Sequence, residues 1–169
     1  MTGLPPRMRL AFVGWCVWMC REWRDTGGIS QRHWYRWNGD GPDTFDCSGF
    51  VLYGVTLFGA PNLSKTWNCD RMWKSNWARL ELGQVEPGDL AFYGMPSHAT
   101  HVMVWAGDGS VIGASGGGSN TTTPQVARIQ NAFVKRKPVH NYRPDFLGFR
   151  RFEPLAALTR LQPPTPESV

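Results

Sequence analysis

The sequence predicts a single α+β domain in which N-terminal helices pack on a central antiparallel β-sheet. Apolar residues recur at helical spacing in the first half of the chain, whereas from Pro87 onward they follow the pattern of strands. Helices followed by turn-connected strands are typical of α+β chains with an antiparallel sheet. The 169 residues, 41% of them hydrophobic, suffice for one buried core and are too few for a second large domain.

Three helices are expected, each bounded by residues that stop a helix. They cover about residues 7–25 (ended by Gly27-Gly28), the apolar run from Phe50 to Phe58 (ended by Gly59-Ala60-Pro61), and residues 67–80. Strands are expected over Leu90–Tyr93, His101–Trp105, a segment that starts at Ser110, and Phe146–Phe152. Gly107-Asp108-Gly109 predicts a hairpin turn between two of these strands.

The ends of the chain define the expected domain. Residues 161–169 contain three prolines and no large apolar side chain after Leu161, which predicts a flexible C-terminal tail behind one domain over residues 1–160. The apolar stretch Leu10–Cys20 is too short to span a bilayer, and no small-residue cleavage site follows it. We therefore expect an amphipathic first helix, no signal peptide and no stable membrane insertion.

The composition is basic, with 18 Lys and Arg against 13 Asp and Glu and a net charge of +5. Such a charge favours nucleic acid, acidic lipid or an anionic cell wall as a partner, and it is equally compatible with a solvated basic surface. The densest basic run, Lys135-Arg136-Lys137, is too short for a nucleic-acid-binding tail. We expect no nucleic-acid partner.

Four cysteines occupy positions 16, 20, 47 and 69, and no Cys or His pair follows at zinc-finger spacing. We expect neither a structural metal nor an organic cofactor. A domain with its own core does not need disulfides, so we interpret three of the cysteines as packing thiols and Cys47 as the reactive one.

Cys47 is singled out because it stands where a loop turns into a helix, a position that favours the thiolate. Asp46 can cap this helix, and a buried cysteine behind a capping aspartate is the alternative interpretation. His101 opens a predicted strand and could supply the base that a nucleophilic thiol needs, although a single histidine on a strand can also be structural.

Five segments together carry a specific resemblance to the NlpC/p60 cysteine peptidases. They are YRWNG at 35–39, GPD at 41–43, FDCSGFV at 45–51, PGDLAF at 87–92 and HVMVWAGDG at 101–109. The first three resemble the family's nucleophile segment and the last two its strand before the histidine and its histidine strand. The resemblance runs in consistent order from about residue 8 to residue 152.

The resemblance implies a papain-like fold that cleaves an amide bond in the peptidoglycan stem peptide, of the γ-D-glutamyl-diaminopimelate type. Cys47 would be the nucleophile and His101 the general base and then acid, while Tyr35 would stabilise the oxyanion. Asp46 and Ser48 match the residues that bind the free amine of L-Ala, and helix capping is the alternative role for both. The stem peptide is the expected partner.

One departure concerns the third polar residue, which the family usually carries on the strand next to that of the catalytic histidine. Twelve residues beyond His101, the usual position holds Gly113. A three-residue turn at 107–109 would instead set Ser115 opposite His101, and His98, Asn120 and Gln130 are further candidates; none is assigned. A catalytically impaired wall-binding module and a related thiol amidase or acyltransferase therefore stay open as alternatives.

The context of the protein is also an expectation. A chain with neither a signal peptide nor wall-binding repeats suits a phage-encoded lysin, released at lysis, or a tail-associated virion component. We expect a protein that is made in the cytoplasm and acts on the cell wall as a monomer.

Overall fold

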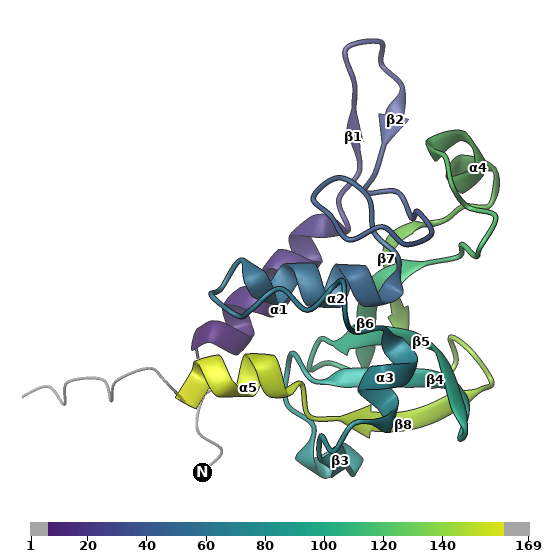
Figure 1. Ribbon diagram of the computed structural model, residues 1–169. Helices are drawn as coiled ribbons and strands as arrows, with labels where there is room; N and C mark the ends of the chain where they lie inside the picture. The colour runs from purple at the N-terminus through teal and green to yellow at the C-terminus, as the bar shows by residue number, and fades with distance from the viewer. Residues whose placement is uncertain (1–6, 161–169) are drawn as a thin grey trace, which may run out of the picture.

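The computed structural model describes residues 7–160 (Figure 1). The predicted tail at 161–169 lies outside the described residues. The helices are α1 (Arg7–Met19), α2 (Cys47–Thr56), α3 (Cys69–Lys74), α4 (Pro124–Ile129) and α5 (Glu153–Arg160), with a 3₁₀ turn at Leu82–Gln84. The strands are β1 (Trp23–Arg24), β2 (Ser30–Gln31), β3 (Arg79–Leu80), β4 (Leu90–Met95), β5 (His98–Trp105), β6 (Ser110–Ser115), β7 (Phe133–Pro138) and β8 (Phe146–Arg150).

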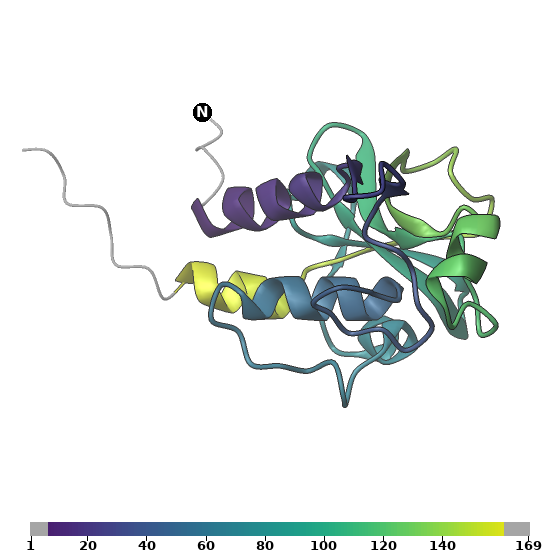
Figure 2. The ribbon, with the colours of Figure 1, turned by 90° about the horizontal axis from the view of Figure 1, so that it is seen from above.

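The main sheet confirms the predicted fold class. It has six strands in the order β3-β8-β4-β5-β6-β7, and every neighbouring pair is antiparallel. The strands predicted around Leu90 and His101 are β4 and β5, and the predicted turn at 107–109 joins β5 to β6. Helices α1, α2 and α5 lie together on one side of this sheet (Figures 1 and 2).

Two apolar layers hold the sheet. On the helical side, Phe12 of α1, Phe50 and Val55 of α2, and Val102 and Val104 of β5 form the larger core. On the other side a smaller cluster, which includes Tyr93, Met103 and Trp105, is covered by the segment after β7. Burial of both faces explains the continuous apolar runs of β4 and β5, since a sheet covered on both sides needs no polar face.

A buried ion pair ties α1 to the sheet. The Arg9 guanidinium lies 3.1 Å from a carboxylate oxygen of Asp89, and that side chain is fully buried. Asp89 also accepts a hydrogen bond from the backbone N–H of Phe152, just before α5. Leu158 of α5 approaches Gly59, which lies just beyond the C-terminal end of α2. The beginning of α1 and the end of α5 therefore meet near the C-terminal end of α2.

Two of the predicted helices are wrong in length. The first ends at Met19, well before Gly27-Gly28. These glycines instead form the turn between β1 and β2, where the Asp25 carboxylate accepts hydrogen bonds from two backbone N–H groups. The third is only α3, since the chain leaves the helix at Ser75 and pairs Arg79–Leu80 with β8. Arg150 fixes this exit with hydrogen bonds to the carbonyls of Trp73 and Trp77.

Several elements were not predicted from the sequence: α4, α5 and β7, the short strands β1, β2 and β3, and the 3₁₀ turn at Leu82–Gln84. The strand predicted over Phe146–Phe152 is β8, which ends at Arg150. No helix among residues 7–160 is long and apolar enough to cross a membrane.

Candidate active site

Cys47 is the first residue of α2, and its position is fixed by the turn before it. The Asp46 carboxylate caps the helix, accepting a hydrogen bond from the backbone N–H of Gly49 at 2.7 Å and one from the Ser48 hydroxyl at 3.0 Å. A side chain at Gly49 would lie 1.9 Å from the Gly39 carbonyl oxygen, so glycine lets the preceding loop pack against this helix start. The thiol consequently lies at the positive end of the helix dipole.

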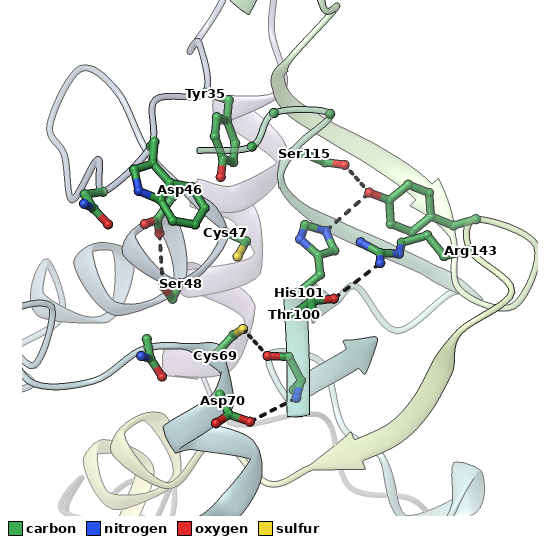
Figure 3. Close-up of a pocket in the computed structure, with 18 of the residues that line it drawn as sticks. Tyr35, Asp46, Cys47, Ser48, Cys69, Asp70, Thr100, His101, Ser115 and Arg143 are labelled. Atoms are coloured by element: carbon green, nitrogen blue, oxygen red, sulfur yellow. Dashed lines mark hydrogen bonds between the residues drawn. The ribbon is translucent and has the colours of Figure 1, made fainter. Parts of the chain in front are cut away.

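His101 reaches the same cleft from β5, where it pairs with Tyr93 of β4 and is 6% exposed. Its Nε2 atom lies 3.3 Å from the hydroxyl of Tyr142, and that hydroxyl in turn makes a short contact with the Ser115 hydroxyl (Figure 3). The three side chains form a hydrogen-bonded row that leads away from Cys47. Tyr142 on Nε2 leaves Nδ1 as the ring nitrogen free to act on the thiol.

The hairpin register agrees with the predicted three-residue turn at 107–109, which sets Ser115 rather than Gly113 opposite His101. Val104 pairs with Ile112 and Trp105 with Val111, and continuing this register sets Gly113 opposite Met103 and Ser115 opposite His101. Ser115 contacts the Tyr142 hydroxyl, and Tyr142 is the group that reaches the imidazole. Sequence reasoning missed Tyr142, since it lies 41 residues from His101 with no spacing signal between them.

The other three candidates are engaged elsewhere or face away. His98 lies 3.3 Å from a carboxylate oxygen of Asp70, Gln130 accepts a hydrogen bond from Thr121, and Asn120 is exposed. No group of three metal-ligating side chains occurs within residues 7–160.

Tyr35 lines the cleft with its ring buried and its hydroxyl directed toward the cleft (Figure 3). A side chain at Gly117 would lie 2.1 Å from the Tyr35 ring, so the glycine-rich segment after β6 packs directly against it. Burial, together with the neighbouring Cys47, raises the pKa of the Tyr35 hydroxyl above its usual value. The hydroxyl therefore stays protonated and available as a hydrogen-bond donor.

Cys69 supplies a second thiol to the cleft. Its predicted role as a packing residue is therefore incomplete. It begins α3 behind the capping residue Asn68, in the way that Cys47 begins α2 behind Asp46. Its thiol donates a hydrogen bond to the Ala99 carbonyl at 3.1 Å. All four cysteines are free.

The neighbours of Cys47 act on its acidity in opposite directions. The Cys69 thiol and burial raise the pKa of Cys47, whereas the His101 imidazole lowers it. His101 is thus the neighbour of Cys47 that favours the thiolate form of its thiol.

The cleft that holds these side chains has a volume of about 940 Å³. All five residues predicted as site residues line it: Tyr35, Asp46, Cys47, Ser48 and His101. Its charges are segregated, with Asp46 and Asp70 contributed by the two helix starts and Lys135 and Lys137 contributed by β7. A thiol, an imidazole and a protonated phenol in one cleft can carry out nucleophilic attack on a carbonyl.

Comparisons with known proteins bear on the family and the fold of this chain. The model of the NlpC/P60 family matches residues 32–142. The probable endopeptidase p60 of Listeria innocua is 37% identical over 84 residues, which cover 50% of this chain and 17% of that protein. Protein P54 of Enterococcus faecium is 30% identical over 112 residues, covering 66% of this chain and 19% of that protein. The chain thus spans only a small part of these relatives.

Solved structures share the fold. The NlpC/p60 domain of the peptidoglycan hydrolase SagA gives a TM-score of 0.58 at 23% identity, over 85% of this chain and 98% of that one. An NlpC/P60 family protein from Bacillus cereus gives 0.61 at 19% identity, over 88% of this chain and 41% of that one.

Proposed function

Because this chain belongs to the NlpC/P60 family, we propose that it is a cysteine endopeptidase that hydrolyses an amide bond in the peptidoglycan stem peptide. One observation carries the proposal: the thiol of Cys47 at a helix start and the imidazole of His101 on a strand share one cleft. The names of its relatives, which include endopeptidases and a peptidoglycan hydrolase, point to the same activity. The bond we propose is the γ-D-glutamyl-diaminopimelate amide.

Cys47 and His101 would carry the bond-breaking steps. Nδ1 of His101 takes the thiol proton, and the Cys47 sulfur attacks the amide carbonyl to give a tetrahedral intermediate. His101 then donates that proton to the leaving amine, the C–N bond breaks and a thioester forms. A water molecule, deprotonated by His101, attacks the thioester and releases the acid and the free thiol.

Tyr35 would stabilise the intermediate, because its protonated hydroxyl can donate a hydrogen bond to the oxyanion. The backbone N–H groups at the start of α2 add positive potential on the same side.

Tyr142 would act as a positioning residue for His101. When Nε2–H donates to the Tyr142 hydroxyl, and that hydroxyl donates to Ser115, Nδ1 is left unprotonated and ready to act as a base. The same arrangement stabilises the imidazolium after proton transfer, since Nε2–H keeps its acceptor. This role belongs in many thiol enzymes to a third polar side chain, which here comes from a loop.

Asp46 and Ser48 would bind the free amine of the substrate. Burial raises the pKa of the Asp46 carboxyl, and its hydrogen bonds from Gly49 and Ser48 oppose that rise. An ammonium group beside it would favour the carboxylate, so binding of the substrate amine and ionisation of Asp46 support each other.

The test is release of new amino groups from purified peptidoglycan by the wild type and by Cys47→Ala. Cys20→Ala is the matched control, because its thiol lies on α1's C-terminal side and does not line the cleft. We expect release by the wild type and by the control and none by Cys47→Ala. Equal release by all three would contradict the thiol mechanism, and wall binding without release by the wild type would favour an impaired binding module.

Mass spectrometry of the released muropeptides then identifies the bond. Products that begin with diaminopimelate support the proposed bond, whereas products cut elsewhere in the stem, or transferred to a second amine, favour the amidase or acyltransferase alternative. Phage or virion association is a separate proposal, which detection of the protein in purified virions would test.

A further inference from the structure

Two lysines of the cleft have no part in the chemistry described above. We propose that Lys135 and Lys137 form a carboxylate-binding site on the leaving side of the scissile bond, so that the enzyme selects stem peptides whose diamino acid carries a free carboxylate. This inference rests on the proposed function, because it assigns a substrate feature to the same cleft.

Strand alternation places Lys135 and Lys137 on the same face of β7. Lys135 and Lys137 are two residues apart on β7 and line the cleft, whereas Arg136 between them points to the other face. Arg136 is engaged there, since its guanidinium bonds the Ser110 hydroxyl at 2.6 Å and pairs with Asp108. The strand thus offers two cationic side chains to the cleft and keeps the third away from it.

Neither lysine has a carboxylate partner among the residues that the structure describes. The Lys135 ammonium donates one hydrogen bond, to the Asn131 carbonyl at 2.7 Å, and lies 3.1 Å from the point where a side chain of residue 116 would begin. Because Gly116 has no side chain, the Lys135 ammonium has room at the wall of the cleft.

The Lys135 ammonium lies 4.4 Å from the centre of the Phe133 ring and has no carboxylate beside it among the described residues. Half-burial lowers the pKa of Lys135 to about 8, and the charges of Lys137 and Arg32 add to the effect. Arg143, the other cation of the cleft, differs in this respect because it is paired with Asp145 at 2.6 Å. An anionic ligand would offset the repulsion at Lys135 and restore its charge, which is the condition for a charge-assisted hydrogen bond.

The chemistry fixes the side of the cleft on which this anion would lie. His101 must protonate the departing amine, so the leaving residue has to lie beside His101. β7 lies on the β6 side of β5, and the register sets Phe133 level with His101 through Ser115. Lys135 and Lys137 are two and four residues further along β7. Figure 3 shows Asp46 and Ser48 on one side of Cys47. His101, Ser115 and Arg143 lie on the opposite side of Cys47 (Figure 3).

The cleft is therefore negative where the substrate amine would bind and positive where the leaving residue would lie. A peptide with a free amine before the scissile bond and a carboxylate after it matches this polarity. A leaving residue whose carboxylate is amidated, or lysine in place of diaminopimelate, lacks the second charge.

Two synthetic peptides test the inference, both with the α-carboxyl of diaminopimelate capped as an amide: L-Ala-γ-D-Glu-diaminopimelate with the side-chain carboxylate free, and the same peptide with that carboxylate amidated. We expect the wild type to favour the free acid in kcat/KM by about tenfold or more, the range of a hydrogen bond to a charged group. In Lys135→Gln/Lys137→Gln the ratio of the two kcat/KM values should approach one, and in Lys137→Gln it should fall part of the way.

Arg136→Gln is the matched control, because it removes a positive charge from the same strand on the opposite face. It should keep the wild-type ratio. Melting temperatures of all variants show that each is folded. A wild type that cleaves both peptides equally, or a double variant with the wild-type ratio, would overturn the carboxylate site and leave the endopeptidase proposal standing.

Calorimetric binding of the two peptides to Cys47→Ala separates the two proposals further. Tighter binding of the free acid, lost in the triple variant that adds Lys135→Gln and Lys137→Gln, supports the site even if the wild type cleaves neither peptide. A wild type that cleaves neither peptide would refute the endopeptidase proposal and leave the carboxylate site standing. Equal binding of both peptides would overturn the carboxylate site.

Discussion

Tyr142→Phe isolates the single hydrogen bond that we assign to the orientation of His101. The substitution removes the hydroxyl that lies 3.3 Å from His101 Nε2 and contacts Ser115. The ring stays in place, since its edge-on packing against Tyr93, with centroids 5.5 Å apart, does not involve the hydroxyl. The change in rate therefore reports on the hydrogen bond rather than on a cavity.

The expected size follows from the contacts. Loss of one neutral hydrogen bond of about 1 kcal/mol from the reacting geometry corresponds to about a fivefold fall in kcat. KM should stay near the wild-type value, because Tyr142 acts through His101. Ser115 is 2% exposed and loses its only side-chain partner within residues 7–160, which costs about 1–3 kcal/mol of unfolding free energy. In a domain of this size each kcal/mol lowers the melting temperature by about 2–4 °C.

The assay measures kcat and KM separately on a synthetic stem peptide, with the melting temperature recorded for each variant. Ser115→Ala is the matched control, because it removes the far end of the row and leaves the contact between Tyr142 and His101. It should lower kcat less than Tyr142→Phe does. A Tyr142→Phe enzyme with wild-type kcat, or one that changes only in KM, would refute the positioning role.

Three further perturbations test other parts of the structure. Cys69→Ala removes the thiol that raises the pKa of Cys47, so alkylation of Cys47 by iodoacetamide, followed by peptide mass spectrometry, should set in at lower pH; an unchanged pH profile would contradict this. Gly117→Ala places a carbon 2.1 Å from the Tyr35 ring and should lower kcat about tenfold or more by displacing the hydroxyl, whereas wild-type activity would show that the oxyanion is stabilised by other groups. Arg9→Met leaves the buried Asp89 without its α1 partner and should cost about 3–5 kcal/mol in urea unfolding; a loss below about 1 kcal/mol would mean that the other contacts of Asp89 compensate for the pair.

Local signals explain which elements could be predicted. Asp46 before Cys47 and the glycines at 107 and 109 act on their immediate neighbours, so the start of α2 and the β5–β6 hairpin were predictable. The end of α3 depends instead on Arg150, which bonds carbonyls more than 70 residues earlier in the chain. No pattern within residues 67–80 carries that information.

The elements that were missed have a similar cause. β7 contains three consecutive basic residues, so in sequence it resembles an exposed loop. Two of these residues, Lys135 and Lys137, line a cleft that exists only in the folded sheet. α5 is short and follows directly on β8, and the burial of Leu155 and Ala156 comes from the fold around it.

The residues of the candidate site also differ in whether a local sequence motif marks them. Cys47, His101, Asp46, Ser48 and Tyr35 stand in motifs that are visible in the chain, and they line one cleft in the structure. Tyr142 and Cys69 reach that cleft from segments without a motif. Ser115, which the predicted turn at 107–109 sets opposite His101, is connected to the imidazole only through the Tyr142 hydroxyl.

The meeting of α1 and α5 near the C-terminal end of α2 has a practical consequence. Cys47 opens α2 at its other end, and the ten residues of that helix span about 15 Å. The start of α1 and the end of α5 lie toward the opposite end of α2 from the one that Cys47 opens (Figure 1). A bead, a biosensor surface or a fluorescent reporter attached at the start of α1 or at the end of α5 would therefore leave the cleft open to a substrate as bulky as a cell-wall fragment.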